Sequence, residues 1–285
     1  MQPKKLALIH DMCGIGHCSM TVALPIVSVM GIQGCPIPTA IFSSHTAYKN
    51  WHKVDFTDHI PSYLEAWDKE HVSLDGIYCG YLGSGEQVNA VLNLVQKHSD
   101  SLFFLDPVMG DHGVLYSAIT AEHVFAMKAL VSHADYIVPN ITEACVLTDT
   151  AYKTDFSTEE LEEIVQKLHL LGPKNVVITG IRNENTFCNV VSSTENTQNY
   201  ATSATPNTPV LEYIKVPVAG NARPGTGDIF ASVLVSGILK GQPFESSVQK
   251  AAHFVAKCIQ LSDEKCLPIV EGTCFELVLP TLLQE

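Results

Sequence analysis

Positive charge is scarce in this sequence. Among 285 residues, 17 are Lys or Arg, only two of these are arginine, and 30 are Asp or Glu, so the formal net charge is −13. A surface of this sign repels nucleic-acid phosphates, and we therefore expect no nucleic-acid partner. Long apolar runs are also missing, since none approaches the ~20 residues that a membrane helix needs. We expect no membrane association.

Signatures of secretion are absent as well. The nine cysteines form no CxxC pair, and their odd number does not suit a disulfide framework. The first apolar run, 6–9, is shorter than the ~7–15 apolar residues of a secretory signal. These features predict reduced thiols in a cytoplasmic protein.

Three common site motifs are lacking. No GxxxxGK[ST] sequence occurs, which excludes a P-loop, and neither HExxH nor GxSxG is present to support a zinc protease or a hydrolase elbow. The string that begins at Asp11 resembles a dinucleotide fingerprint, but Ser19 takes the place of its third glycine. A nicotinamide dinucleotide site is therefore excluded.

Short apolar runs alternate with helical patterns along the first two thirds of the chain. Apolar residues make up 46% of the sequence, which allows a large buried core. The strand candidates are apolar throughout, as strands buried on both faces are, and cover 6–9, 39–42, 76–79, 102–106, 136–138 and 176–179. This alternation predicts βαβ units and a mainly parallel sheet in an α/β fold.

The pattern changes after Thr179. Segments 187–192 and 211–216 predict a small antiparallel addition to the sheet, and 227–240, 245–262 and 271–283 predict helices. The sequence shows neither an internal repeat nor a long linker, so we expect residues 1–285 to form a single domain.

The strongest motif is Arg-Pro-Gly-Thr-Gly-Asp at 223–228, which opens an apolar helix. Gly225 and Gly227 leave backbone N–H groups open to an anion, and the helix dipole adds positive character there. Together with Thr226, these glycines would form an anion hole. Asp228, in the first turn of the helix, is suited to act as a base that takes a proton from a substrate hydroxyl beside this anion hole. The alternative is that Asp228 only complements the helix dipole. The motif alone does not separate these interpretations, but the buried helix and the further motifs favour catalysis.

Two acidic motifs follow apolar strands. Asp106 and Asp111 belong to the first, and Asn140 and Glu143 to the second. Carboxylates from separate strand ends predict a Mg²⁺ site, because Mg²⁺ binds through a few carboxylates and keeps its waters. Alternatively, Asn140 and Thr142 only cap the next helix and Asp111 only forms a turn.

A polar cluster with aromatics follows an earlier strand. His45, Thr46 and Tyr48 lie directly after the strand at 39–42. Hydroxyls and one imidazole beside aromatic rings suit a small polar ring as ligand. The alternative is a turn in which Tyr48 and Trp51 only pack.

Taken together, these motifs resemble a known family. GTGD before a buried helix, with DPVMGD and NxxE upstream, is similar to the ribokinase-like superfamily. Within it, FSSHTAY, CGYLGSGEQ and FLDPVMGD resemble the pyridoxal/pyridoxine/pyridoxamine kinase family, from residue 6 to about 256. The resemblance implies a three-layer α/β/α sandwich and the ATP-dependent phosphorylation of the 5′-hydroxymethyl group of a pyridoxal vitamer. It also implies a homodimer, which is common in the family.

The resemblance also assigns roles to the site residues. Asp228 would be the catalytic base, with the anion hole at Gly225, Thr226 and Gly227. The magnesium and the ATP phosphates would be served by Asp106 and Glu143. The nucleotide would lie near Asp111, Asn140, Thr179 and Arg223, the last of which is two residues before the anion hole. The vitamer pocket would be lined by His45, Thr46 and Tyr81.

One string departs from the family pattern. The family usually has Gln-Ser-His after the first strand, whereas this chain has His10-Asp11-Met12. A carboxylate at Asp11 could accept a hydrogen bond from a protonated ring nitrogen or an amine. We therefore predict a preference for pyridoxamine or pyridoxine over pyridoxal.

Other functions stay open at this stage. Hydroxymethylpyrimidine (phosphate) kinases typically have Cys where Asp228 stands, which argues against that specialisation. A sugar kinase of the same superfamily would share GTGD but lack the His45-Thr46 pocket. A non-catalytic vitamer-binding protein would bind the ligand without consuming ATP, and the complete set of acidic residues argues against it.

Overall fold

A nine-stranded sheet organises the chain in a computed structural model that describes residues 2–117, 119–183, 186–195, 210–217 and 219–283. Its strand order is β11-β10-β9-β8-β5-β4-β1-β2-β3. The strands are β1 (Lys5–Cys13), β2 (Gln33–Phe42), β3 (Lys53–Asp55), β4 (Gly76–Cys79), β5 (Leu102–Leu105), β8 (Tyr136–Ile137), β9 (Asn175–Asn183), β10 (Thr186–Ser193) and β11 (Glu212–Pro217).

The middle of the sheet is parallel, and both edges are antiparallel. The neighbouring strands β9, β8, β5, β4, β1 and β2 pair in parallel. In contrast, β10 pairs antiparallel with both β9 and β11. This arrangement confirms the predicted parallel sheet and its antiparallel addition. The short strand β3 adds a second antiparallel edge beside β2, and a separate hairpin pairs β6 (Gly110–Asp111) with β7 (Val114–Leu115).

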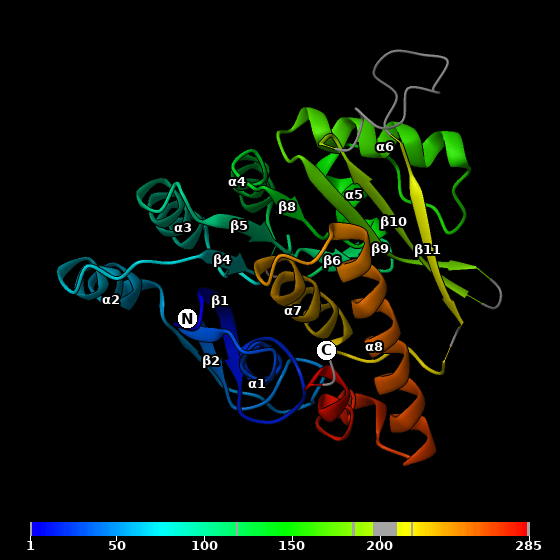
Figure 1. The fold of residues 1–285 in the computed structure, drawn as a ribbon, viewed down its shortest axis with the longest axis horizontal. Helices are drawn as coiled ribbons and strands as arrows, with labels where there is room; N and C mark the ends of the chain where they lie inside the picture. The colour runs from blue at the N-terminus through cyan, green and yellow to red at the C-terminus, as the bar shows by residue number, and fades with distance from the viewer. Residues whose placement is uncertain (1, 118, 184–185, 196–209, 218, 284–285) are drawn as a thin grey trace.

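Helices cover both faces of the sheet and make three layers (Figure 1). Leu6 and Leu8 of β1 belong to one buried cluster with α1 (Met20–Val29), α7 (Thr226–Leu239) and α8 (Phe244–Glu264), whereas Ala7 and Ile9 belong to a second cluster with the helices from α3 (Gly85–Lys97) to α6 (Thr158–Leu170). Successive strand residues point to opposite faces, so a strand between two helical layers must be apolar at every position. That requirement explains the continuous apolar runs of the sequence.

The helices have well-defined ends. Ser157 and Glu160 form the capping box that starts α6, in which each side chain accepts a hydrogen bond from the other's backbone N–H. The α-helices are α1 (Met20–Val29), α2 (Ile60–Lys69), α3 (Gly85–Lys97), α4 (Ala121–Val131), α5 (Ile141–Leu147), α6 (Thr158–Leu170), α7 (Thr226–Leu239) and α8 (Phe244–Glu264). Among the described residues, no helix is both long and apolar enough to cross a membrane.

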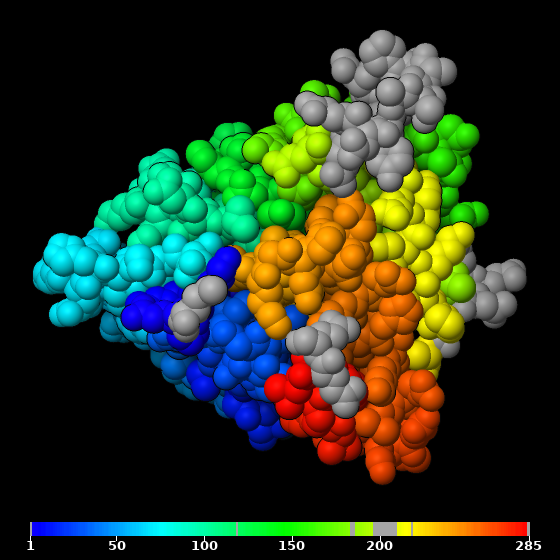
Figure 2. Space-filling model, viewed as in Figure 1, coloured from blue at the N-terminus to red at the C-terminus, as the bar shows by residue number. Residues whose placement is uncertain are grey.

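The helix predicted over 271–283 is wrong. This stretch contains 3₁₀ turns instead, at η3 (Ile269–Glu271), η4 (Phe275–Leu277) and η5 (Leu279–Leu283). Gly272 interrupts them with a left-handed φ of 81°, and Pro280 has no N–H to continue an α-helix. The segment folds back between the N-terminal third of the chain and α8, where Figure 2 shows it in red.

Candidate active site

A cavity of about 270 Å³ opens where the parallel strands end. Ligands of parallel α/β sheets bind in this position. The cavity is lined by most of the residues that the sequence predicted for the site, namely Tyr81, Asp106, Asp111, Asn140, Glu143, Thr179, Arg223, Gly225, Thr226, Gly227 and Asp228. Strand ends far apart in the sequence therefore converge as expected.

A second cavity of about 390 Å³ adjoins the first. The two share Thr179, Arg223 and Thr226, and beyond these residues the second becomes mostly apolar. Its apolar wall comes from β11 and α8 and includes Val216, Ala252, Val255 and Ile259. The pair of cavities thus combines a polar chamber with an apolar slot.

The GTGD loop forms a positively polarised end of α7. Gly225 is the N-cap residue with a φ of 79°, and a Cβ built on it would lie 1.8 Å from the His17 carbonyl oxygen. Only glycine fits that close approach. Among the described residues, apart from the neighbouring residues of its own helix, no atom lies within 4 Å of a Cβ built on Gly227. The first N–H groups of a helix have no partner inside the helix, so this end can receive an anion.

Asp228 lies in the first turn of α7 and is half-buried. Burial raises its pKa to about 7, the backbone N–H of Ser19 opposes that rise by donating to the carboxylate, and nearby Asp11 adds to it. A base works best when its pKa lies near the working pH. The Asp228 carboxylate therefore suits the removal of a proton at neutral pH.

Asp106 and Glu143 bring two further buried carboxylates into the cavity. Burial raises the pKa of Asp106, and the charges of Glu143 and Asp228 raise it further. Burial also raises the pKa of Glu143. Such a group of carboxyls favours the approach of a cation.

Glu143 and Asn140 also have a structural role. The two residues form a capping box at the start of α5, and the other oxygen of Glu143 accepts from the Met109 N–H at 3.0 Å. The Asn140 amide nitrogen donates to the Gly110 carbonyl at 2.8 Å. These bonds hold the loop after β5 against α5, so Asn140 and Glu143 both cap the helix and also line the cavity.

The carboxylates of Asp106 and Glu143 are the type of ligand that Mg²⁺ prefers, but they are too few to hold the ion by themselves. Hard oxygen donors are what Mg²⁺ prefers, and it is commonly held by one or two carboxylates together with water and substrate phosphates. Within the described part of the chain, no three His, Cys, Asp or Glu side chains lie close enough to hold a metal ion by themselves. Asp106 and Glu143 therefore fit an ion that arrives with a phosphate ligand.

The predicted vitamer-side residues separate into two groups. Tyr81 lines the cavity, whereas Asp11, His45 and Thr46 are not among the described residues that line it. Thr46 is exposed and Asp11 is buried within β1. The pKa of Asp11 is raised by burial, although hydrogen bonds from Ser19 and Cys13 oppose the rise.

His45 differs from its prediction because both ring nitrogens are occupied. Nδ1 accepts from the Ala47 N–H at 3.2 Å, and Nε2 donates to the Val270 carbonyl at 2.6 Å. With both nitrogens engaged in this way, the ring has no nitrogen left for a ligand. His45 helps to hold the surrounding loops together.

Arg223 also differs from its prediction. It lines both cavities, but its N–H groups donate to Asp263 and to backbone carbonyls of the C-terminal segment. The sequence placed Arg223 near the nucleotide because it lies two residues before Gly225. Its partners lie 40–49 residues further along the chain, a separation that no local pattern reveals.

Two residues that line the cavity were not predicted from the sequence as site residues. Ser19 lines the cavity and its N–H reaches Asp228, but the sequence marked it only as the residue in place of the third glycine of a dinucleotide fingerprint. Tyr116 lines the cavity from the segment after β7, where no pattern marks it. The position of Ser19 after the glycines of the first loop is the one signal that could have pointed to it.

Comparisons with known proteins agree with this geometry. Residues 24–269 match the family model described as phosphomethylpyrimidine kinase. A pyridoxal kinase from Vibrio parahaemolyticus is 30% identical over 244 residues, which covers 82% of this chain and 79% of that protein. A pyridoxal kinase from Dictyostelium discoideum is 28% identical over 248 residues, covering 82% and 78%.

Solved structures share the fold. A protein from Bacteroides thetaiotaomicron assigned to the phosphomethylpyrimidine kinases has a TM-score of 0.92 and 34% identity, covering 100% of this chain and 96% of its own. The same protein was solved in another crystal form with pyridoxal, where the TM-score is 0.89. The chain therefore belongs to the ribokinase-like family that the phosphomethylpyrimidine kinase model describes and that includes these pyridoxal kinases.

Proposed function

We propose that this protein transfers the γ-phosphoryl group of ATP to the 5′-hydroxymethyl group of a pyridoxal vitamer. The observation that carries this proposal is Asp228, a carboxyl with a pKa near 7 beside the amide-rich N-terminus of α7. The relative from Bacteroides thetaiotaomicron, solved with pyridoxal at 34% identity, supports the choice of acceptor.

The chain's own groups account for the steps. Asp228 accepts the hydroxyl proton as the substrate oxygen forms a bond to the γ-phosphorus and the bond from that phosphorus to the ADP oxygen breaks. The N–H groups at the start of α7 stabilise negative charge on the phosphoryl oxygens.

Asp106 and Glu143 would hold Mg²⁺, which would neutralise phosphate charge when it is bound. The apolar slot beside them suits the purine base of the nucleotide, because Val216 and Val255 can pack against its faces. Asp111 and Thr179 line both cavities and would therefore lie between the base and the phosphates.

A second candidate is the phosphorylation of hydroxymethylpyrimidine or its phosphate. The description of the matching family model favours it. The aspartate at position 228, where that specialisation typically has cysteine, favours the vitamer instead. The two substrates share a hydroxymethyl group on a nitrogen ring, so one panel of acceptors separates them.

The test is an ATP-consumption assay with pyridoxal, pyridoxine, pyridoxamine, hydroxymethylpyrimidine, its phosphate and ribose. We expect turnover with at least one vitamer, with the phosphorylated product identified by mass spectrometry. Turnover restricted to a pyrimidine would establish the second candidate. Vitamer binding without ATP consumption would replace the kinase with a non-catalytic vitamer-binding protein.

Three wider expectations accompany the proposal. A homodimer is supported by exposed apolar side chains near the β2–β3 edge, where Ile41 is 42% and Val54 is 50% exposed. A cytoplasmic location is supported by nine cysteines that are all free thiols and all within the described residues. That residues 1–285 form one domain stays a prediction.

A further inference from the structure

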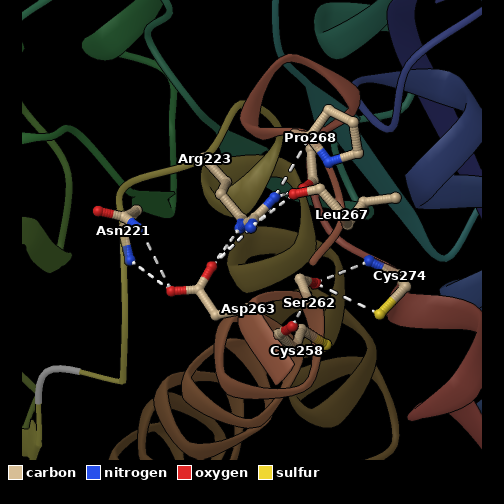
Figure 3. Close-up of polar contacts among 9 residues, drawn as sticks. Asn221, Arg223, Cys258, Ser262, Asp263, Leu267, Pro268 and Cys274 are labelled. Atoms are coloured by element: carbon tan, nitrogen blue, oxygen red, sulfur yellow. Dashed lines mark hydrogen bonds and ion pairs between the residues drawn. The ribbon is translucent and has the colours of Figure 1, made fainter. Parts of the chain in front are cut away.

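Arg223 has no N–H group left for a phosphate. An arginine guanidinium has five N–H donors. In this structure they reach five acceptor contacts, two on the Asp263 carboxylate and three on the carbonyls of Leu267, Pro268 and Gly272, at 2.5–3.3 Å. Figure 3 shows the guanidinium turned toward Asp263 and the C-terminal segment. The side chain therefore serves the protein itself.

These contacts of Arg223 join separate parts of the protein in its interior. The Arg223 side chain is only 2% exposed, and a buried charge is tolerated only when it is paired and hydrogen-bonded. Asp263, near the end of α8, also accepts from the backbone N–H of Asn221. Ser262 beside it accepts from the Cys274 N–H at 2.9 Å. Segment 267–276, here called the clasp, is thus tied to Arg223 and α8.

The clasp in turn holds the first loop of the chain, residues 14–19. The Glu271 carbonyl accepts from the backbone N–H of His17 at 3.2 Å and from its Nδ1 at 2.6 Å. The carboxylate of Glu276 lies 2.9 Å from the other ring nitrogen of His17. The Val270 carbonyl accepts from His45, whose ring lies against Gly16. The clasp therefore fixes loop 14–19 at three points.

Loop 14–19 completes the site. The His17 carbonyl lies against Gly225 so closely that a side chain there would collide with it. Ser19, at the end of the loop, donates its N–H to the carboxylate of Asp228. The position of loop 14–19 thus sets both the anion hole and the base.

We propose that Arg223 is a positioning residue, which acts through the clasp to hold loop 14–19 against the GTGD loop. Its guanidinium donates hydrogen bonds to backbone carbonyls of the clasp. Other carbonyls of the clasp bind His17 and His45. The catalytic part of this inference rests on the proposed kinase function. The structural part, the ordering of loop 14–19 by Arg223, does not.

The test compares Arg223→Ala, Arg223→Lys, Asp263→Ala and the double variant with a remote control. Lys128→Met is the control, because Lys128 bonds both oxygens of Asp149 on another side of the sheet. Turnover is measured below the melting temperature of every variant, together with the KM values for vitamer and for ATP. Hydrogen exchange of loop 14–19 is measured by mass spectrometry, with α6 as internal reference.

We expect Arg223→Ala and Arg223→Lys to lower kcat by about 10- to 100-fold, since a ~1 Å misplacement has effects of that order. The vitamer KM should rise, the ATP KM should stay within about twofold, and loop 14–19 should exchange faster. Lysine should not rescue, because a lysine ammonium has only three N–H donors. Asp263→Ala should act in the same direction, and the double variant should be less than additive.

Two outcomes would overturn the inference. A raised ATP KM that lysine restores would make Arg223 a phosphate ligand. Normal kinetics and unchanged exchange in loop 14–19, with only a lower Tm, would make it a purely stabilising residue. If Arg223→Ala does not fold, Arg223→Lys and Asp263→Asn provide the same comparison. Wild-type inactivity toward every acceptor would disprove the kinase function, while the exchange measurement would still test the clasp.

Discussion

Opposing influences set the charge of Asp228. Burial raises the pKa of this carboxyl to about 7, and the Ser19 N–H holds it from rising further. In the free protein, the deprotonated base is therefore lost as the pH falls below about 7. A general base at this position should give activity that increases with pH through the neutral range.

Replacement of Asp228 by Asn keeps the shape of the side chain but removes the base. General-base catalysis is worth about 10²–10⁴-fold, so kcat should fall by that factor. Nucleotide affinity, measured by calorimetry, should stay within a few-fold. Asp58→Asn, at an exposed carboxyl on η1 (Thr57–His59), is the matched control. Near-normal turnover of Asp228→Asn would remove Asp228 from the role of base.

Asp11 sets a second expectation at the residue scale. Its buried carboxylate, with a pKa raised by burial, lies close enough to Asp228 and Tyr81 to influence their titration. Hydrogen bonds to charged groups contribute about 1.5–3 kcal/mol. Asp11→Ser should therefore shift the ratio of kcat/KM for pyridoxamine to that for pyridoxal by about 10-fold or more, in favour of pyridoxal. An unchanged ratio would contradict this role, and Asp11→Asn separates the effect of charge from that of size.

At the scale of the elements, the contact between the clasp and loop 14–19 includes a titratable group, His17. His17 is bonded through both ring nitrogens to oxygen atoms, and its Nε2 contact with the Glu276 carboxylate raises its pKa above the ordinary value. The folded protein thus binds the proton more tightly than the unfolded chain. The resulting stabilisation is complete below a pH of ~6.5 and disappears as the pH rises through the higher folded value.

His17→Gln should remove this pH-dependent stabilisation. Partly exposed ion pairs contribute about 0–1 kcal/mol, so the Tm of the variant should be about 1–3 °C lower than that of the wild type at pH 6. The difference should shrink at pH 9. Thermal denaturation across this range measures it, with His253→Gln on the exposed face of α8 as control. A difference that does not depend on pH would show that the ion pair adds no stability.

Sequence patterns predicted the elements where burial is uniform. Strand β4 matches its predicted bounds at Gly76–Cys79 because every one of its side chains is buried. The stretch 271–283 misled the prediction because its apolar residues fit a helical period, whereas Gly272 and Pro280 prevent an α-helix. Local propensity is a weak guide where such residues interrupt the pattern.

The site was predictable where one motif supplies both residue and position. Asp106, Glu143 and Asp228 follow strands or open a helix, and sheet topology then brings them together. Arg223 and His45 were misjudged because their partners come from the clasp, whose path depends on tertiary structure. A sequence identifies hydrogen-bond donors, but only the fold determines which of them are already satisfied.

At the scale of the whole molecule, the excess of negative charge means that binding of an anionic nucleotide needs a cation. The chain carries a net charge of −13, and the cavity is lined by four carboxylates where a nucleoside triphosphate should bind. The amides of α7 offer only partial positive charge. Nucleotide binding should therefore depend strongly on Mg²⁺.

Thermal melting with a non-hydrolysable ATP analogue tests this dependence. With Mg²⁺ and the analogue at ~100 times its Kd, binding should add about 2.7 kcal/mol and raise Tm by roughly 5–10 °C. The analogue with excess EDTA should leave Tm near that of the free protein, and added Mg²⁺ should restore the shift. An equal shift in EDTA would show that the protein binds the nucleotide without a metal ion.

The clasp also bears on how the protein acquires activity during its synthesis. The Glu271 carbonyl is hydrogen-bonded to the ring of His17, which lies 254 residues earlier in the chain. The Val270 carbonyl is hydrogen-bonded to the ring of His45, which lies 225 residues earlier. Ribosomes add about 5–20 residues each second, so these contacts can form only some 13–50 s after His17 is made. The parallel strands at the centre of the sheet can assemble before then. We therefore expect a nascent chain that has folded its sheet to reach full activity only after residues 267–276 emerge and contact loop 14–19.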